Sequence, residues 1–127
     1  MFINLNKHSD HSFFMKLALS QAQKNLGNTS ENPSVGCVIT KNNMVISVGC
    51  TSINGRPHAE HNAIKLSRTN LEDSKLYATL EPCSHHGKTP PCTKLIIKNK
   101  IKKVFFSIDD PDLKSHNKCT KLLKSKK

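Results

Sequence analysis

The sequence is that of a small, strongly basic protein. Its 127 residues, 35% of them hydrophobic, are enough for one compact domain with a buried core and too few for two. The formal net charge of +11 comes mostly from lysine and favours contact with polyanions, although a biased genome composition explains it better than a nucleic-acid-binding face.

No apolar run approaches the roughly 20 residues of a membrane span, and residues 1–10 lack the apolar core of a signal peptide. The five cysteines are an odd number, which argues against a disulfide framework and for reduced thiols or metal ligands. We therefore expect a soluble, cytoplasmic protein with no membrane partner.

The first half of the chain predicts a helix followed by a β-hairpin. Apolar residues recur at helical spacing over residues 11–26, with Asp10 as a candidate N-cap and Gly27 placed to end the helix. Two β-rich runs over residues 35–40 and 44–49 flank a short polar turn, which is the spacing of a hairpin.

The second half alternates helix and strand. We expect a helix over residues 57–67, a strand over 76–80, a helix over 92–98, a strand over 104–108 and a last short helix with Leu122 and Leu123. Such alternation implies parallel strands joined by right-handed crossovers. The predicted fold is therefore α/β, with three layers (α/β/α) around a mixed central sheet, in a single domain over residues 1–127 whose core spans 10–125.

A small set of residues suggests zinc chemistry. His58, Cys83 and Cys92 offer one imidazole and two thiolates, and a catalytic zinc site uses three such ligands with water as the fourth. Glu60 is then available as a base. Residues two apart on a helix point to nearly opposite sides, so His58 and Glu60 can share a site only at the helix start, where Pro57 places them.

Both cysteines lie at the ends of predicted elements. Cys92 follows Pro90 and Pro91 in the first turn of its helix, where the positive end of the helix dipole favours a thiolate. Cys83 closes a strand. Two helix starts and one strand end that meet beyond the edge of a sheet form the usual ligand site of open α/β folds.

The order of these motifs resembles that of zinc deaminases. Their signature is His-x-Glu followed by Pro-Cys-x-x-Cys, but here eight residues separate Cys83 from Cys92. The stretch over residues 80–92 reads LEPCSHHGKTPPC and resembles the deaminase domain of riboflavin-pathway enzymes. The likeness spans about residues 10–125 and implies a cytidine deaminase-like fold. Further agreement comes from three segments: 32–39, 57–60 and 110–111.

The resemblance implies hydrolytic removal of the 2-amino group from 2,5-diamino-6-(5-phosphoribosylamino)pyrimidin-4-one, a phosphorylated pyrimidine of riboflavin biosynthesis, to give the 5-aminouracil product and ammonia. Zn²⁺ would be the cofactor, held by His58, Cys83 and Cys92, with Glu60 as general acid and base. Besides Glu60, substrate contacts are expected from five residues: Asn32, which with Glu60 should hold the ring and ribose, Ala59, Ser84, and Lys88 with Thr89 at the phosphate.

Two regions depart from the family pattern. Relatives usually carry a histidine in place of Thr51 and a glycine-rich segment in place of residues 114–117. The sequence contains nothing that resembles the reductase domain that often follows. We therefore expect either that a separate reductase performs the next step or that the chain has been cut. Whether the protein forms a homo-oligomer stays open.

Three other interpretations compete with this one. A closed structural zinc site would take His85 or His86 as its fourth ligand, but it would have no use for Glu60. Alternatively, the protein deaminates cytosine, guanine or transfer-RNA adenosine, which its basic charge favours and the eight-residue spacing and Lys88 oppose. A non-catalytic zinc-stabilised nucleic-acid-binding module should carry stacking aromatics. These are only 5% of the chain, so we expect any nucleic-acid binding to be weak and non-specific.

The remaining cysteines and histidines are expected to lie outside the site. Cys37 and Cys50 fall in predicted strands and are interpreted as small core residues, and Cys119 as a thiol on a helix face. Four histidines have no evident partner and are interpreted as surface residues: His8, His11, His61 and His116.

Overall fold

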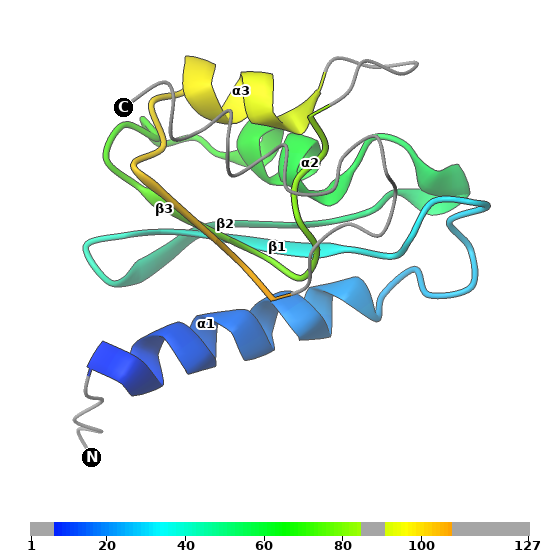
Figure 1. Cartoon of the computed structure of the whole chain (residues 1–127), viewed down its shortest axis with the longest axis horizontal. Coiled ribbons are helices and arrows are strands. Elements are labelled where there is room, and N and C mark those ends of the chain that lie inside the picture. Colours follow the sequence, from blue (N-terminus) through cyan, green and yellow to red (C-terminus); the bar gives the residue numbers. More distant parts are fainter. Residues whose placement is uncertain (1–6, 85–90, 108–127) are drawn as a thin grey trace.

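The computed structural model describes residues 7–84 and 91–107, which are drawn in colour in Figure 1. The elements in this part of the chain are α1 (Lys7–Ala22), β1 (Gly36–Lys41), β2 (Met44–Cys50), the 3₁₀ helix η1 (Ile53–Gly55), α2 (Ala59–Leu66), β3 (Lys75–Ala78), α3 (Cys92–Lys98) and β4 (Lys103–Phe106). No helix within these residues is long and apolar enough to cross a membrane. The predictions for residues 110–111, 114–117 and 122–123 and for Cys119 lie outside the described residues.

The strands form one mixed sheet with the order β2-β1-β3-β4. β1 and β2 pair antiparallel across a tight turn, in which Asn42 and Asn43 adopt positive φ angles of 53° and 65°. Asparagine tolerates this conformation better than most residues. β1 also pairs antiparallel with β3, and β3 pairs parallel with β4 through the crossover that contains α3. The predicted hairpin and the predicted mixed sheet are both confirmed.

Helices cover both faces of this sheet: α1 lies on one face, and α2 and α3 lie on the other (Figure 1). Because successive side chains of a strand point to opposite faces, β1 contributes to two core clusters. Val38 packs on the α1 side with Phe14 and Tyr77. The larger cluster on the other side joins the sheet to α2 and α3 and includes Cys37, Ile39, Ala59, Ala63, Leu76 and Ile96. The predicted three-layer α/β/α arrangement is confirmed.

Gly49 of β2 lets the start of α2 lie directly against the sheet. A Cβ atom at position 49 would lie 2.6 Å from the backbone nitrogen of Ala63 and nearer still to the carbonyl oxygen of Ala59. Both are backbone atoms of α2, so no side chain could move aside to make room. The buried hydroxyl of Ser47 on the same strand donates a hydrogen bond of 2.6 Å to the Ala63 carbonyl. The first turn of α2 is thus fixed on β2.

The first helix differs from its prediction at both ends. It begins at Lys7, so Asp10 lies inside the helix and its carboxylate accepts a hydrogen bond from Asn43 Nδ2 (2.8 Å) instead of capping. It ends at Ala22, since the backbone amides that follow bond three residues back, as Gln23 does to the Ser20 carbonyl. Helical periodicity therefore predicted the existence of this helix better than its limits.

His11 is not the unpartnered surface residue that the sequence predicted. Its Nδ1 lies 2.6 Å from the Tyr77 hydroxyl, and its ring centroid lies 4.6 Å from that of Phe105. The prediction was wrong because α1 turns this side chain toward the sheet, where Tyr77 and Phe105 stack on each other. His11 belongs to the packing on the α1 side.

Candidate metal centre

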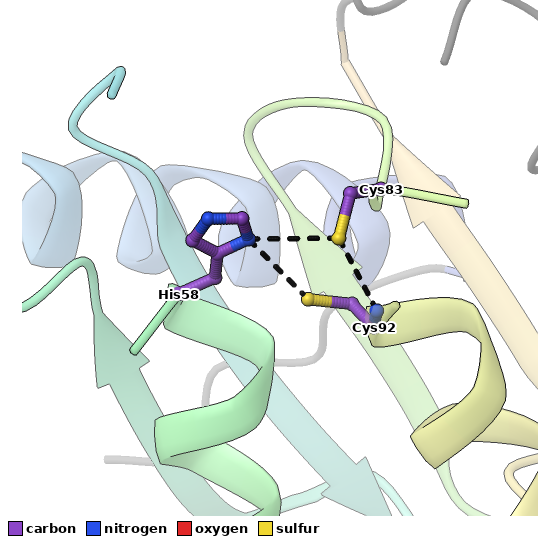
Figure 2. Close-up of side chains that lie close together, drawn as sticks. All are labelled: His58, Cys83 and Cys92. Carbon is purple, nitrogen blue, oxygen red and sulfur yellow. Dashed lines mark hydrogen bonds between the residues drawn. The ribbon is translucent and has the colours of Figure 1, made fainter. Parts of the chain in front are cut away.

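One group of side chains in the described part of the chain could hold a metal ion: His58, Cys83 and Cys92, whose ligand atoms all lie within 4.8 Å of one another. His58 Nδ1 is 3.5 Å from Cys83 Sγ and 3.6 Å from Cys92 Sγ (Figure 2). Tetrahedral zinc, with bonds of about 2.0 Å to nitrogen and about 2.3 Å to sulfur, would set such nitrogen–sulfur distances at about 3.6 Å. The two nitrogen–sulfur distances therefore fit a zinc ion.

Each of these side chains comes from a place where the chain enters or leaves a regular element, as Figure 2 shows. His58 precedes α2 and keeps an extended backbone (φ −70°, ψ 164°), and Cys92 is the first residue of α3. Cys83 lies in the irregular segment after β3 and does not close the strand as predicted. Pro82 before it has no N–H to continue a strand ladder. The two helix starts meet as predicted, but the third residue comes from the irregular segment after β3 and not from a strand end.

The sulfur of Cys83 is stabilised as an anion by its neighbours. The Cys92 backbone amide donates a hydrogen bond to Cys83 Sγ (3.2 Å), and the Thr93 amide donates to the Cys83 carbonyl (3.1 Å). The hydrogen bond from the Cys92 side chain, helped by that from His58 and opposed by burial, lowers the pKa of Cys83 to about 4. The Cys92 side chain and backbone amide thus favour Cys83 as a thiolate, which is the form that binds a metal cation.

The neighbouring Cys83 raises the pKa of both Cys92 and His58. The pKa of Cys92 is raised above its usual value, first because its thiol is hydrogen-bonded to Cys83 and then because it is buried. The pKa of His58 is raised mainly by its hydrogen bond to Cys83. A second thiolate in this place would therefore need a positive charge beside it, which a divalent metal ion supplies.

Glu60 lies beside this cluster and is only 3% exposed. Burial raises the pKa of its carboxyl group, and the hydrogen bond from its own backbone amide is the main effect that opposes this rise. Glu60 is the second residue of α2, immediately after the extended His58, so both side chains can face the same site. A buried carboxyl group with a raised pKa is suited to exchanging protons with a reacting molecule.

Cys37 is close to Glu60 but has a different character. It is fully buried in the core cluster on the α2 side of the sheet. Burial, and then the charge of Glu60, raise the pKa of its thiol well above the usual value. Cys37 is therefore a neutral core residue, as the sequence predicted.

The residues expected to contact a substrate are placed in different ways. Asn32 is half-buried, and its Nδ2 donates to the Gly55 carbonyl (2.9 Å), which joins two loops beside His58. Ala59 is fully buried. The Oγ of Ser84 is buried and has no hydrogen-bond partner among the described residues. Lys88 and Thr89 lie outside the described residues, as do the neighbouring His85 and His86.

Thr51 uses its hydroxyl to hold the segment beside Asn32. The hydroxyl accepts a hydrogen bond from the Val35 amide (2.9 Å) and donates one to the Pro33 carbonyl (3.1 Å). The Thr51 amide donates in turn to the Val35 carbonyl (3.0 Å), and the residue is buried. The departure at this position therefore has a structural use that the sequence did not suggest.

Two asparagines that sequence reasoning missed hold the segment that joins β2 to α2. The side-chain amides of Asn25 and Asn62 both donate to backbone carbonyls between residues 50 and 57. Asn25 is distant in sequence and gave no signal. Asn62 did give one, because it follows His58 by four residues and so lies on the same side of α2.

Known proteins are similar to this chain in sequence and in fold. The family model for the cytidine and deoxycytidylate deaminase zinc-binding region matches residues 8–108. A diaminohydroxyphosphoribosylamino-pyrimidine deaminase of Buchnera aphidicola subsp. Acyrthosiphon pisum is 40% identical over 119 residues, which cover 86% of this chain and 81% of the relative. A riboflavin biosynthesis protein RibD of Actinobacillus pleuropneumoniae is 46% identical over 99 residues, which cover 78% of this chain and 26% of the relative.

The structural comparison agrees with the sequence comparison. The solved diaminohydroxyphosphoribosylaminopyrimidine deaminase/5-amino-6-(5-phosphoribosylamino)uracil reductase of Thermotoga maritima superposes with a TM-score of 0.90 at 41% identity, over 95% of this chain and 35% of that one. The chain spans about a quarter of the length of the RibD relatives that it matches (27% and 26%). All three cluster residues fall within the segment that the family model covers.

Proposed function

Since the chain belongs to the family defined by the cytidine and deoxycytidylate deaminase zinc-binding region, we propose that it hydrolytically deaminates 2,5-diamino-6-(5-phosphoribosylamino)pyrimidin-4-one in riboflavin biosynthesis. The observation that carries this proposal is the cluster of His58, Cys83 and Cys92 with the buried Glu60 beside it. Support for this substrate comes from the names of the relatives that match at 40% identity or more.

Zinc is the cofactor of this family's site, and His58, Cys83 and Cys92 are the residues that we propose as its ligands. Zinc held there would supply a water molecule that ionises near neutral pH. The two sulfurs and the imidazole leave the carboxyl group of Glu60 outside the ligand set. Glu60 is thereby kept for proton transfer.

In the proposed reaction Glu60 accepts a proton from the attacking water and delivers it to a ring nitrogen next to the carbon under attack. The new carbon–oxygen bond forms at the carbon that carries the 2-amino group. Glu60 then takes the proton from the new hydroxyl group and passes it to that amino group, which leaves as ammonia while the ring carbon becomes a carbonyl. One water is consumed for each ammonia released. The buried position of Glu60 supports this role because burial raises the pKa of its carboxyl group, which favours holding a proton between the two transfers.

The substrate-binding residues are part of the same proposal. Asn32 lies on a loop tied to Gly55, close in the chain to His58, and Ser84 follows the proposed ligand Cys83. The buried Ser84 hydroxyl, with no partner among the described residues, is a group that a bound substrate could satisfy. Ala59, Lys88 and Thr89 complete the set, with Lys88 and Thr89 assigned to the phosphate.

The proposal also covers the domain organisation of the chain, its cellular location and its partners. Residues 1–127 would form a single zinc-dependent deaminase domain, and a reductase would act on its product in the next step. The solved Thermotoga maritima protein is named for both activities, and the match covers 35% of it. Reduced cysteine ligands suit the cytoplasm. Nucleic acid would bind only weakly and without sequence preference, and self-association into a homo-oligomer is to be tested directly.

Ammonia release from a panel of substrates tests the proposal. The zinc-loaded protein is incubated with the phosphorylated diaminopyrimidine, cytidine, deoxycytidylate, guanine and a transfer-RNA anticodon arm, beside a Glu60→Gln control. The proposal expects release from the phosphorylated diaminopyrimidine far above that from the others. Preferential release from any other member of the panel would contradict the proposed substrate while leaving the deaminase family intact.

A further inference from the structure

Asn62 ties together the chain that leads into His58. It lies in α2, and its side-chain Nδ2 is within hydrogen-bond distance of three acceptors: the Cys50 carbonyl (2.8 Å), Ser52 Oγ (2.9 Å) and the Pro57 carbonyl (3.3 Å). An amide has two N–H donors, so the longest of these contacts shares a donor with another. The three acceptors mark the end of β2 and the two ends of the loop that follows it.

Backbone hydrogen bonds also join the two ends of the loop between β2 and α2. The Ser52 amide donates to the Pro57 carbonyl (3.1 Å), and the Asn62 amide donates to the His58 carbonyl (3.0 Å) in the first turn of α2. Asn62 thus contacts His58 through its backbone and Pro57 through its side chain. Asn62, together with the Ser52 amide, therefore holds the chain where it enters the helix.

The position of the imidazole depends on that direction. His58 has an extended backbone, and its side chain does not cap the helix. Its ring reaches across to two sulfurs at 3.5 Å and 3.6 Å, so a small rotation of the backbone at Pro57 would move Nδ1 away from both. Groups that orient a metal ligand without touching the metal are commonly worth about 10- to 100-fold in metal affinity or activity.

We propose that Asn62 is the positioning residue for His58, holding the Pro57 carbonyl and the end of β2 so that the imidazole meets the two cysteine sulfurs. This inference rests on the proposed role of His58 as a zinc ligand. The amide acts through His58 and touches neither the metal nor the substrate. Removing the Asn62 amide should therefore weaken zinc binding more than it changes the chemical step.

Asn25 supplies a matched control. Its side-chain amide donates to the Thr51 carbonyl (2.9 Å) and contacts Cys50 Sγ (3.7 Å), so it holds the same end of β2 from the α1 side. It is half-buried like Asn62, and no hydrogen bond links it to Pro57 or His58 among the described residues. Asn25→Ala should therefore cost stability without releasing the imidazole.

The test measures the rate at which zinc passes from the loaded full chain to a chromogenic chelator, with thermal unfolding followed in parallel. Asn62→Ala should release zinc about 10- to 100-fold faster than the parent, and Asn25→Ala should stay close to the parent rate even if its Tm falls. Asn62→Asp keeps the shape but has no N–H to donate, so it should behave like Asn62→Ala. Equal release rates for Asn62→Ala and Asn25→Ala, or a parent-like rate for Asn62→Asp, would overturn the inference.

Ammonia release by the parent, measured in the same preparations, separates this inference from the proposed function. A parent that deaminates nothing in the panel, combined with faster zinc release from both Asn62 variants, would reject the proposed function and support the positioning role. An active parent whose zinc release is unaffected by either variant would reject the positioning role alone.

Discussion

Replacing Gly49 by alanine tests whether the close packing of α2 against β2 sets the geometry of the site. The added Cβ would lie 2.6 Å from Ala63 N, 3.1 Å from Ala63 Cα and nearer still to the Ala59 carbonyl oxygen. All of these are backbone atoms of α2, so the overlap can be relieved only if the helix moves. To reach an ordinary contact of about 3.4 Å from Ala63 N, the helix must move by almost 1 Å, and it carries His58 and Glu60 with it.

Overpacking of this kind typically costs about 1–3 kcal/mol of folding free energy. A displacement of about 1 Å in a catalytic group can cost on the order of 100-fold in rate. We therefore expect Gly49→Ala to lower both the Tm and kcat for ammonia release, with kcat measured well below the Tm so that the protein is folded. Urea unfolding and steady-state ammonia release are the two assays.

Gly27→Ala is the control, because Gly27 has a backbone conformation that favours glycine but no close neighbour that an added Cβ would contact. Gly27 has a φ of +87° and no atom within 4 Å of an added Cβ, so alanine there strains the backbone without pushing on α2. Such strain costs about 1–2 kcal/mol, and kcat should stay near that of the parent. The reasoning is refuted if Gly49→Ala keeps parent-like kcat, or if Gly27→Ala loses as much kcat as Gly49→Ala does.

The other predictions concern the proposed roles of single side chains. Glu60→Gln keeps the shape of the side chain, so zinc content by metal analysis should be unchanged while kcat falls by about 100- to 10,000-fold; a loss of only a few-fold would contradict the role of Glu60. Cys83→Ser should lower zinc content and Tm together because metal binding is coupled to folding, and full zinc occupancy would point to another ligand. Lys88→Met should reduce kcat/KM for the phosphorylated substrate by about 10- to 100-fold, through loss of a charge-assisted hydrogen bond. The same variant should barely change kcat/KM for the dephosphorylated analogue, and an equal effect on both would withdraw Lys88 from phosphate recognition.

The cluster of His58, Cys83 and Cys92 could be predicted from the sequence because short local patterns mark its members. His58 and Glu60 are two residues apart after a proline, and Cys92 opens a helix after two prolines. Each of these short patterns fixes both a residue type and a place at the end of an element. The alternation of strands and helices in the second half likewise predicted the parallel pairing of β3 with β4.

The features that the sequence did not reveal depend on contacts between distant segments. Nothing in the sequence around Gly49 distinguishes it from other glycines in strands. Only the close approach of α2 shows why a Cβ is excluded there. His11 carries no pattern that predicts its pairing with Tyr77, 66 residues away. Asp10 fits the composition of an N-cap, but the helix continues past it to Lys7, since local propensity sets helix ends only weakly.

The central claim is that this chain removes an amino group by adding water to a pyrimidine ring, and labelled water tests it most directly. The zinc-loaded protein is incubated with the phosphorylated diaminopyrimidine in ¹⁸O-water, and the product is examined by mass spectrometry while ammonia is quantified. The account predicts a product that carries a single ¹⁸O at the former amino position, with ammonia released in equal amount. A product without the label, or ammonia formed equally fast by the Glu60→Gln protein, would contradict it.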